Sequence, residues 1–120
     1  MKKDTEYDLN VLKALKQLQV PLVTWSGTLV YFDKDKRYES IYEHIANKKH
    51  HLTVKDINEI PVILRNKKAL IVDRSGRKFH TYSGRRGKKK DKLKYLKIIT
   101  SINGNKKESI VTVYLTKKIE

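Results

Sequence analysis

The second half of the chain has the residue pattern of a small β-sheet, and this pattern constrains the fold more than any other feature. Apolar and polar residues alternate along four stretches that turn-forming residues separate. Asn103-Gly104 is a strong hairpin signal, which makes the last two stretches antiparallel neighbours. We therefore predict an antiparallel meander of four strands, over Ala69–Arg74, Lys78–Ser83, Leu93–Ser101 and Ser109–Thr116.

Residues at helical spacing precede these strands. The apolar positions recur with a helical period over Thr5–Val20, over residues 37–48 and from Thr53 to Asn66. The last of these segments opens with Thr-Val-Lys-Asp, which resembles a capping box. Between the first two lies Leu22–Phe32, which we interpret as one bulged strand or a short hairpin arm.

The order of these elements predicts a single α+β domain over residues 1–120. A chain of 120 residues is long enough for one core. Residues 1–36 would form an N-terminal helix and a β arm, and residues 37–118 an α+β core with helices packed on the four-stranded antiparallel meander. Trp25, the only tryptophan, is expected to pack in that core.

The charge of the chain limits its partners. Twenty-eight Lys and Arg residues face 13 Asp and Glu residues, a formal net charge of +15. Such an excess favours a polyanionic partner, with nucleic acid (RNA above all) ahead of a membrane surface. The absence of cysteine excludes disulfides and thiolate metal sites. No apolar run could span a bilayer and no signal peptide is visible, so we expect a cytoplasmic location without a membrane partner.

Cations are concentrated between the second and third predicted strands. We expect this basic loop to contact phosphates of a bound nucleic acid. Its candidate binding residues are Arg85, Arg86, Lys88, Lys89 and Lys90.

Strand alternation also gathers polar side chains on one predicted face of the sheet, the open face, which we expect to point away from the helices. It would carry His80, Tyr82, Tyr95, Lys97, Thr112 and Tyr114. His44, with His50 or His51, could reach its edge from the helical segment. Metal-free RNA cleavage needs a base, an acid and cations around the phosphorus, and these residue types supply them. Alternatively, the aromatic residues only stack on bases and the face binds without chemistry.

Metal and cofactor chemistry has little support. His50 and His51 are adjacent, and side chains of adjacent histidines seldom bind one ion. Asp56 and Asp73 stand alone, so a two-metal nuclease is not predicted. No P-loop or dinucleotide-binding fingerprint is present. We expect neither a metal nor a cofactor.

Four short stretches follow one another in a recognisable order: His44-Ile45, Lys49-His50, the motif Asp56-Ile57-x-x-Ile60-Pro61-x-x-Leu64-x-Asn66, and Ile110–Tyr114 on the last strand. With them, the stretch from His44 to Thr116 resembles the phage- and mobile-element-associated nucleases of the barnase–EndoU–colicin–RelE superfamily, including the toxin domains of phage MuF-type proteins. The resemblance implies metal-independent RNA cleavage through a 2′,3′-cyclic phosphate, and allows an inhibitor or immunity protein as a second partner. The site would include His44, His50, Thr112 and Tyr114.

We therefore predict a small metal-independent endoribonuclease of toxin or effector type. His44 or His50 would be the base or the acid, Lys97 and the arginines of the basic loop would stabilise phosphate charge, and Thr112 and Tyr114 would position the scissile group. The alternative is a non-catalytic nucleic-acid-binding protein that uses the same basic sheet surface.

Overall fold

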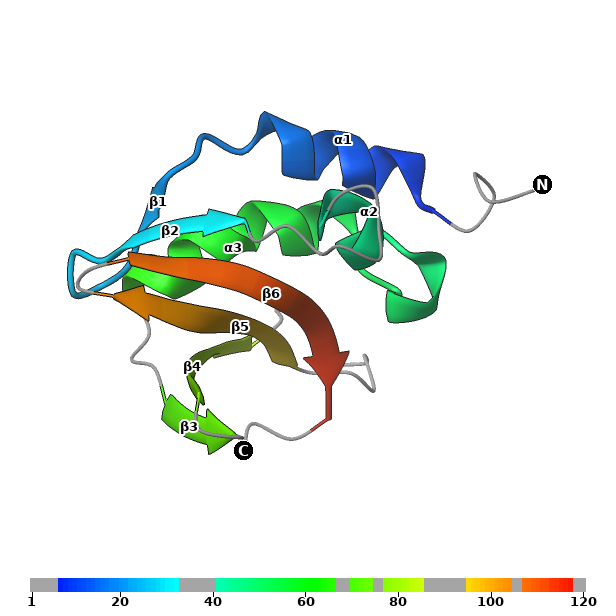
Figure 1. The fold of residues 1–120 in the computed structure, drawn as a ribbon. Coiled ribbons are helices and arrows are strands. Elements are labelled where there is room, and N and C mark those ends of the chain that lie inside the picture. The colour runs from blue at the N-terminus through cyan, green and yellow to red at the C-terminus, as the bar shows by residue number, and fades with distance from the viewer. Residues whose placement is uncertain are drawn as a thin grey trace.

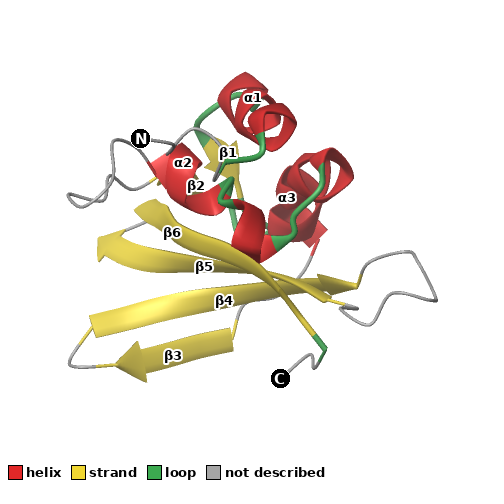
Figure 2. Cartoon of the chain, turned by 90° about the vertical axis from the view of Figure 1, so that its right-hand side faces the viewer, coloured by secondary structure: helices red, strands yellow, loops and turns green. Residues whose placement is uncertain are grey.

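Helices cover one face of a curved, twisted sheet in this α+β protein (Figures 1 and 2). The computed structural model describes residues 7–32, 41–66, 70–74, 77–85, 95–104 and 107–117, without the side chains of 70–77 and 103–104. A 3-10 turn, Lys48–His50, follows the second helix. The helices are α1 (Leu9–Gln17), α2 (Ile41–Ile45) and α3 (Val54–Asn66). None of the helices in the described part of the chain combines the length and apolar character needed to span a membrane.

The described strands form a six-stranded sheet in the order β1-β2-β6-β5-β4-β3. The predicted meander is confirmed as β3 to β6, which pair antiparallel in sequence. The prediction that the sheet has four strands was wrong, because the predicted arm over Leu22–Phe32 supplies two more strands, β1 and β2. The second of these, β2, pairs in parallel with β6. The alternation pattern of a strand does not reveal a partner that is distant in sequence. The strands are β1 (Leu22–Val23), β2 (Leu29–Phe32), β3 (Leu70–Arg74), β4 (Arg77–Arg85), β5 (Tyr95–Gly104) and β6 (Lys107–Thr116).

Side chains fix the starts of the two longer helices. α1 begins later than predicted, because Asp8 is its cap and accepts hydrogen bonds from the backbone N–H groups of Asn10 (3.0 Å) and Val11 (3.2 Å). The capping box of α3 is confirmed. The Thr53 N–H and hydroxyl both donate to Asp56 Oδ2 at 3.0 Å, and the Asp56 N–H donates to Thr53 Oγ1 at 3.2 Å.

The core lies between the helices and the sheet. Leu15 of α1, Ile45 of α2, Leu64 of α3 and Ile98 of β5 are fully buried in it. Removing one such side chain from water contributes about 1.5–3 kcal/mol. At Gly84 in β4, an added Cβ would collide with the side chain of Ile63 in α3. The helix and the strand therefore approach closely, and Gly84 marks the helix-facing side of β4.

One extra residue in β6 changes which side chains face the helices. Thr112 pairs with Ile99 of β5, but Ile110 pairs with Thr100, so Val111 is a bulge between them. Ile110 is consequently buried in the core. Strict alternation with Thr112 and Tyr114 would place Ile110 on the open face, but the bulge inverts the alternation on one side of itself.

Trp25 lies in the turn between β1 and β2, and its side chain is 49% exposed. Its backbone N–H donates to the carbonyl of Leu64 at 2.8 Å, and Gly27 in the same turn has a φ of +85°. The prediction of a core tryptophan was wrong. The turn fixes the backbone of Trp25 on α3 and leaves the indole accessible to solvent.

Candidate functional site

Two clusters of polar side chains stand out among the described residues. The Glu108 network is centred on that residue of β6 and includes His80, Tyr82 and Thr100. The histidine pair consists of His44 in α2 and His50 in the 3-10 turn. In Figure 1, α2 lies toward the far end of the sheet from the β1–β2 turn and the start of β6, so the clusters occupy different ends of the fold.

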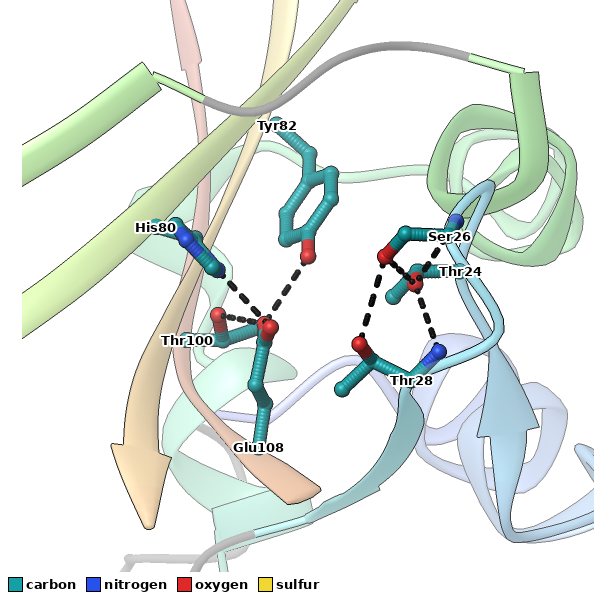
Figure 3. Close-up of polar contacts among 7 residues, drawn as sticks. All are labelled: Thr24, Ser26, Thr28, His80, Tyr82, Thr100 and Glu108. Atoms are coloured by element: carbon teal, nitrogen blue, oxygen red, sulfur yellow. Dashed lines mark hydrogen bonds and ion pairs between the residues drawn. The ribbon is translucent and has the colours of Figure 1, made fainter. Parts of the chain in front are cut away.

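The carboxylate of Glu108 is buried, with 3% exposure, and both of its oxygens are engaged. Oε1 accepts hydrogen bonds from the hydroxyls of Tyr82 (2.8 Å) and Thr100 (2.6 Å). Oε2 lies 2.7 Å from Nδ1 of His80, an ion pair when the imidazole is protonated. Figure 3 shows the three partners converging on this side chain. Hydrogen bonds to an ionised acceptor are stronger than neutral ones, so they offset the cost of burying the charge.

Strand register brings these residues together. From β4, on one edge of β5, His80 pairs with Thr100; from β6, on the other edge, Glu108 pairs with Ile102, two residues further along β5. Residues two apart on a strand share a face, so Tyr82 and His80 lie on the helix side of β4 with Gly84. The prediction that His80 and Tyr82 lie on the open face was therefore wrong. Aromatic residues occur on both sides of this strand, and alternation alone does not show which side meets the helices.

Tyr82 connects the Glu108 network to the β1–β2 turn. Burial raises the pKa of Tyr82 well above its ordinary value, and the hydrogen bond and charge of Glu108 raise that pKa further, while a hydrogen bond with Thr24 opposes them. The phenol is therefore a neutral donor, and at 1% exposure it cannot stack on a base. Thr24 lies in a chain of hydroxyls, 3.1 Å from Ser26 Oγ, which is 3.2 Å from Thr28 Oγ1 (Figure 3).

In the histidine pair, the ring centroids of His44 and His50 are 5.5 Å apart and the planes are nearly perpendicular, at 88°. Asn47 shapes the connecting turn, because its side chain accepts a hydrogen bond from the Lys49 N–H and its carbonyl accepts one from the His50 N–H. Both rings are half-buried. Nδ1 of His50 is shielded from solvent and finds no hydrogen-bond partner among the described residues. His51, which follows, has a left-handed backbone and is exposed.

Burial and neighbouring positive charges both lower the pKa of His50. Burial lowers the pKa of His50 below its ordinary value, and the charge of His44 lowers that pKa further. A hydrogen bond with the backbone of Ile45 opposes these effects, whereas Lys49 and His51 add to them. His50 is therefore a neutral imidazole at neutral pH. It can accept a proton or offer a lone pair.

The other predicted catalytic residues lie on the far side of the sheet from the Glu108 network. Lys97 pairs with Tyr114, Thr112 lies two residues from Tyr114 on the same face of β6, and Tyr95 pairs with Thr116. Their strand positions alternate with those of the core residues of β5, so they share the open face as predicted. Lys97 is only 6% exposed, so the curvature and neighbours of this face remove most of its side chain from solvent.

The predicted basic loop falls mostly outside the described residues. Arg85, at the end of β4, is exposed. Its companions Arg86, Lys88, Lys89 and Lys90 lie outside the described ranges.

Sequence reasoning missed the centre of the Glu108 network and the hydroxyls beside it. A signal for Glu108 was present, because it is the single acid in a ten-residue strand. A second signal was the spacing of Thr24, Ser26 and Thr28, which puts a hydroxyl at every other position around a glycine turn. Neither signal identifies His80 and Tyr82 as partners of Glu108, because these residues lie on β4, 28 and 26 positions earlier in the sequence.

Comparisons of the chain with protein-family models, with curated proteins and with solved structures gave no match. Among the described residues, no group of three or more His, Cys, Asp or Glu side chains is arranged to hold a metal ion. The chemistry available in the described part of the chain is thus a neutral imidazole beside a second imidazole, and a buried carboxylate that orients a partly exposed histidine.

Proposed function

We propose that the protein is a small metal-independent endoribonuclease in which His50 is the general base and His44 the general acid. The observation that carries the proposal is the histidine pair, in which the pKa of one imidazole is lowered by burial and by the other. A base must be neutral and an acid protonated at the same pH. Neighbouring groups that disfavour each other's charge meet this requirement, and such pairs are typical acid–base catalysts.

In the proposed reaction, His50 takes the proton of a ribose 2′-hydroxyl, and the oxygen attacks the adjacent phosphorus. The bond to the 5′-oxygen breaks, and that oxygen receives a proton from His44. The products are a 2′,3′-cyclic phosphate and a 5′-hydroxyl. Lys48 and Lys49, exposed beside the pair, supply positive charge for the phosphate, and the net charge of +15 attracts the polyanion.

This assignment changes the roles expected from the sequence. Lys97, Thr112 and Tyr114 take no part in proton transfer, because α2 packs on the other side of the sheet. Thr112 and Tyr114, which are partly exposed, become candidate RNA contacts on the open face, whereas Lys97 is buried. His80 is assigned to the Glu108 network. A role as a phage or mobile-element toxin or effector follows only from the family resemblance and is part of the proposal.

The experiment is cleavage of total tRNA and a mixed RNA in EDTA, with end-group analysis of the fragments. Wild type should give 2′,3′-cyclic ends, and His44→Gln and His50→Gln should each give far less product. His51→Gln is the matched control, because it removes an exposed imidazole next to the pair and should cut normally. Intact RNA with pure, folded wild type at every salt concentration would refute the proposal.

The second candidate is a non-catalytic nucleic-acid-binding protein, which the net charge and the exposed Arg85 favour. It predicts RNA binding that weakens steeply with salt and gives no product. Lys48→Gln/Lys49→Gln would then weaken binding, while His50→Gln would leave it unchanged. The same preparations serve both tests, so cleavage and gel shift together decide between the candidates.

A further inference from the structure

We infer that His44 and His50 also form a binding site for a divalent transition-metal ion, with Zn²⁺ as the probe, and that the bound ion blocks the pair. Metal binding itself is independent of the proposed function. The inhibitory consequence rests on that function, because an ion on these rings occupies the nitrogens proposed to transfer protons.

The separation of the rings matches a shared ion. An imidazole nitrogen binds zinc at about 2.0–2.1 Å, so the ring centroid lies about 3.2 Å from the ion and two rings at the tetrahedral angle have centroids about 5.2 Å apart. The centroids of His44 and His50 are 5.5 Å apart. The angle of 88° between the ring planes is compatible with this, because each ring can rotate about its metal–nitrogen bond.

The hydrogen bonding of His50 also suits a metal ligand. Its Nδ1 has no hydrogen-bond partner within the described ranges. A buried nitrogen without a partner costs free energy, which a bond to a metal ion would recover. Such a nitrogen is the feature that distinguishes this pair from two histidines that merely pack together.

The donor set determines which ion binds and how firmly. Imidazole nitrogen suits Zn²⁺, Ni²⁺ and Cu²⁺, whereas Mg²⁺ and Ca²⁺ prefer oxygen ligands. Since no third metal-binding side chain joins the pair within the described residues, water would fill the other positions. Lys49 adds positive charge nearby, which opposes a cation. The site should therefore be reversible and weaker than a structural zinc site.

The binding test is calorimetric titration of metal-free, full-length protein with ZnCl₂ at neutral pH. We expect one ion per chain, at least tenfold weaker binding in His44→Gln and in His50→Gln, and unchanged binding in the control His51→Gln. MgCl₂ should give no binding at the same concentrations. Zinc binding that His51→Gln abolishes, or that the double variant His44→Gln/His50→Gln retains, would overturn the inference. So would the absence of binding to wild type.

A parallel cleavage assay separates this inference from the proposed function. Zinc should inhibit RNA cleavage by wild type, and EDTA should restore it. Zinc binding to the pair in a protein that cuts no RNA would support the metal site and refute the nuclease. Cleavage in EDTA by a protein that binds no zinc would refute the metal site and support the nuclease.

Discussion

The Glu108 network and the histidine pair differ in whether their buried polar atoms have hydrogen-bond partners. Both oxygens of Glu108 accept hydrogen bonds from neighbouring strands, whereas Nδ1 of His50 has none from the described residues. A fully bonded buried network makes a fold rigid, whereas an unbonded buried atom costs about 1–3 kcal/mol. The comparison supports a stabilising role for the first cluster and the proposed reaction or ligand binding at the second.

The largest effect should come from Glu108→Ala. The change leaves the Tyr82 and Thr100 hydroxyls and His80 without their shared acceptor. Each buried hydroxyl left without a partner costs about 1–3 kcal/mol, so the free energy of unfolding, measured in urea, should fall by at least about 2 kcal/mol. Where the variant is still folded, RNA cleavage should be close to that of wild type. A loss below about 1 kcal/mol would contradict a stabilising role for this network.

His50→Gln should produce the reverse pattern. Loss of a general base lowers the cleavage rate by about 10²- to 10⁴-fold. The free energy of unfolding should fall by about 0.5–1.5 kcal/mol, less than in Glu108→Ala, because the imidazole loses its hydrogen bond with the Ile45 backbone and its Nδ1 has no partner in the described structure. Urea unfolding and initial cleavage rates measure the two effects. If His50→Gln lost stability as Glu108→Ala does while His51→Gln did not, the contrast between the clusters would fail.

Tyr82→Phe sharpens the comparison by removing one hydroxyl from the Glu108 network. The cost should be about 1–2 kcal/mol, the value for leaving buried partners short of one hydrogen bond. Cleavage should be unaffected. Tyr31→Phe, at an exposed position of β2, is the matched control and should change stability by less than about 0.5 kcal/mol. Equal effects of the two substitutions on urea unfolding would argue against the hydrogen bond.

The smallest effect is a pH dependence of stability from His50. Its pKa is lowered in the folded protein, so the unfolded chain binds a proton more readily. Stability is therefore lost as pH falls from about 6.5, the ordinary histidine value, toward the lowered folded pKa. His50→Gln should lose less stability than wild type over this window, and His51→Gln should match wild type. If the curves of unfolding free energy against pH were parallel for all three proteins, a buried neutral His50 would be contradicted.

The features that could be predicted from the sequence are those that depend on neighbours in the chain. Thr53 and Asp56 are three residues apart and cap α3 as expected. His44 and His50, six residues apart, were both selected, and the structure places their rings together. Contacts between distant strands were not predictable. The pairings of β5 with β4 and with β6, and the bulge at Val111, decide which residues meet Glu108. None of them can be inferred from one strand alone.

The position of β6 has a consequence for how the protein is made. β6 is the last described strand in chain order, yet it lies inside the sheet between β2 and β5. During synthesis on a ribosome, the sheet cannot be completed until β6 has been made, because the parallel pairing with β2 joins segments 78 residues apart (Leu29 with Lys107). Such late, non-local closure slows folding. The nascent chain would gain its complete sheet, and Glu108 with it, only after β6 has left the exit tunnel.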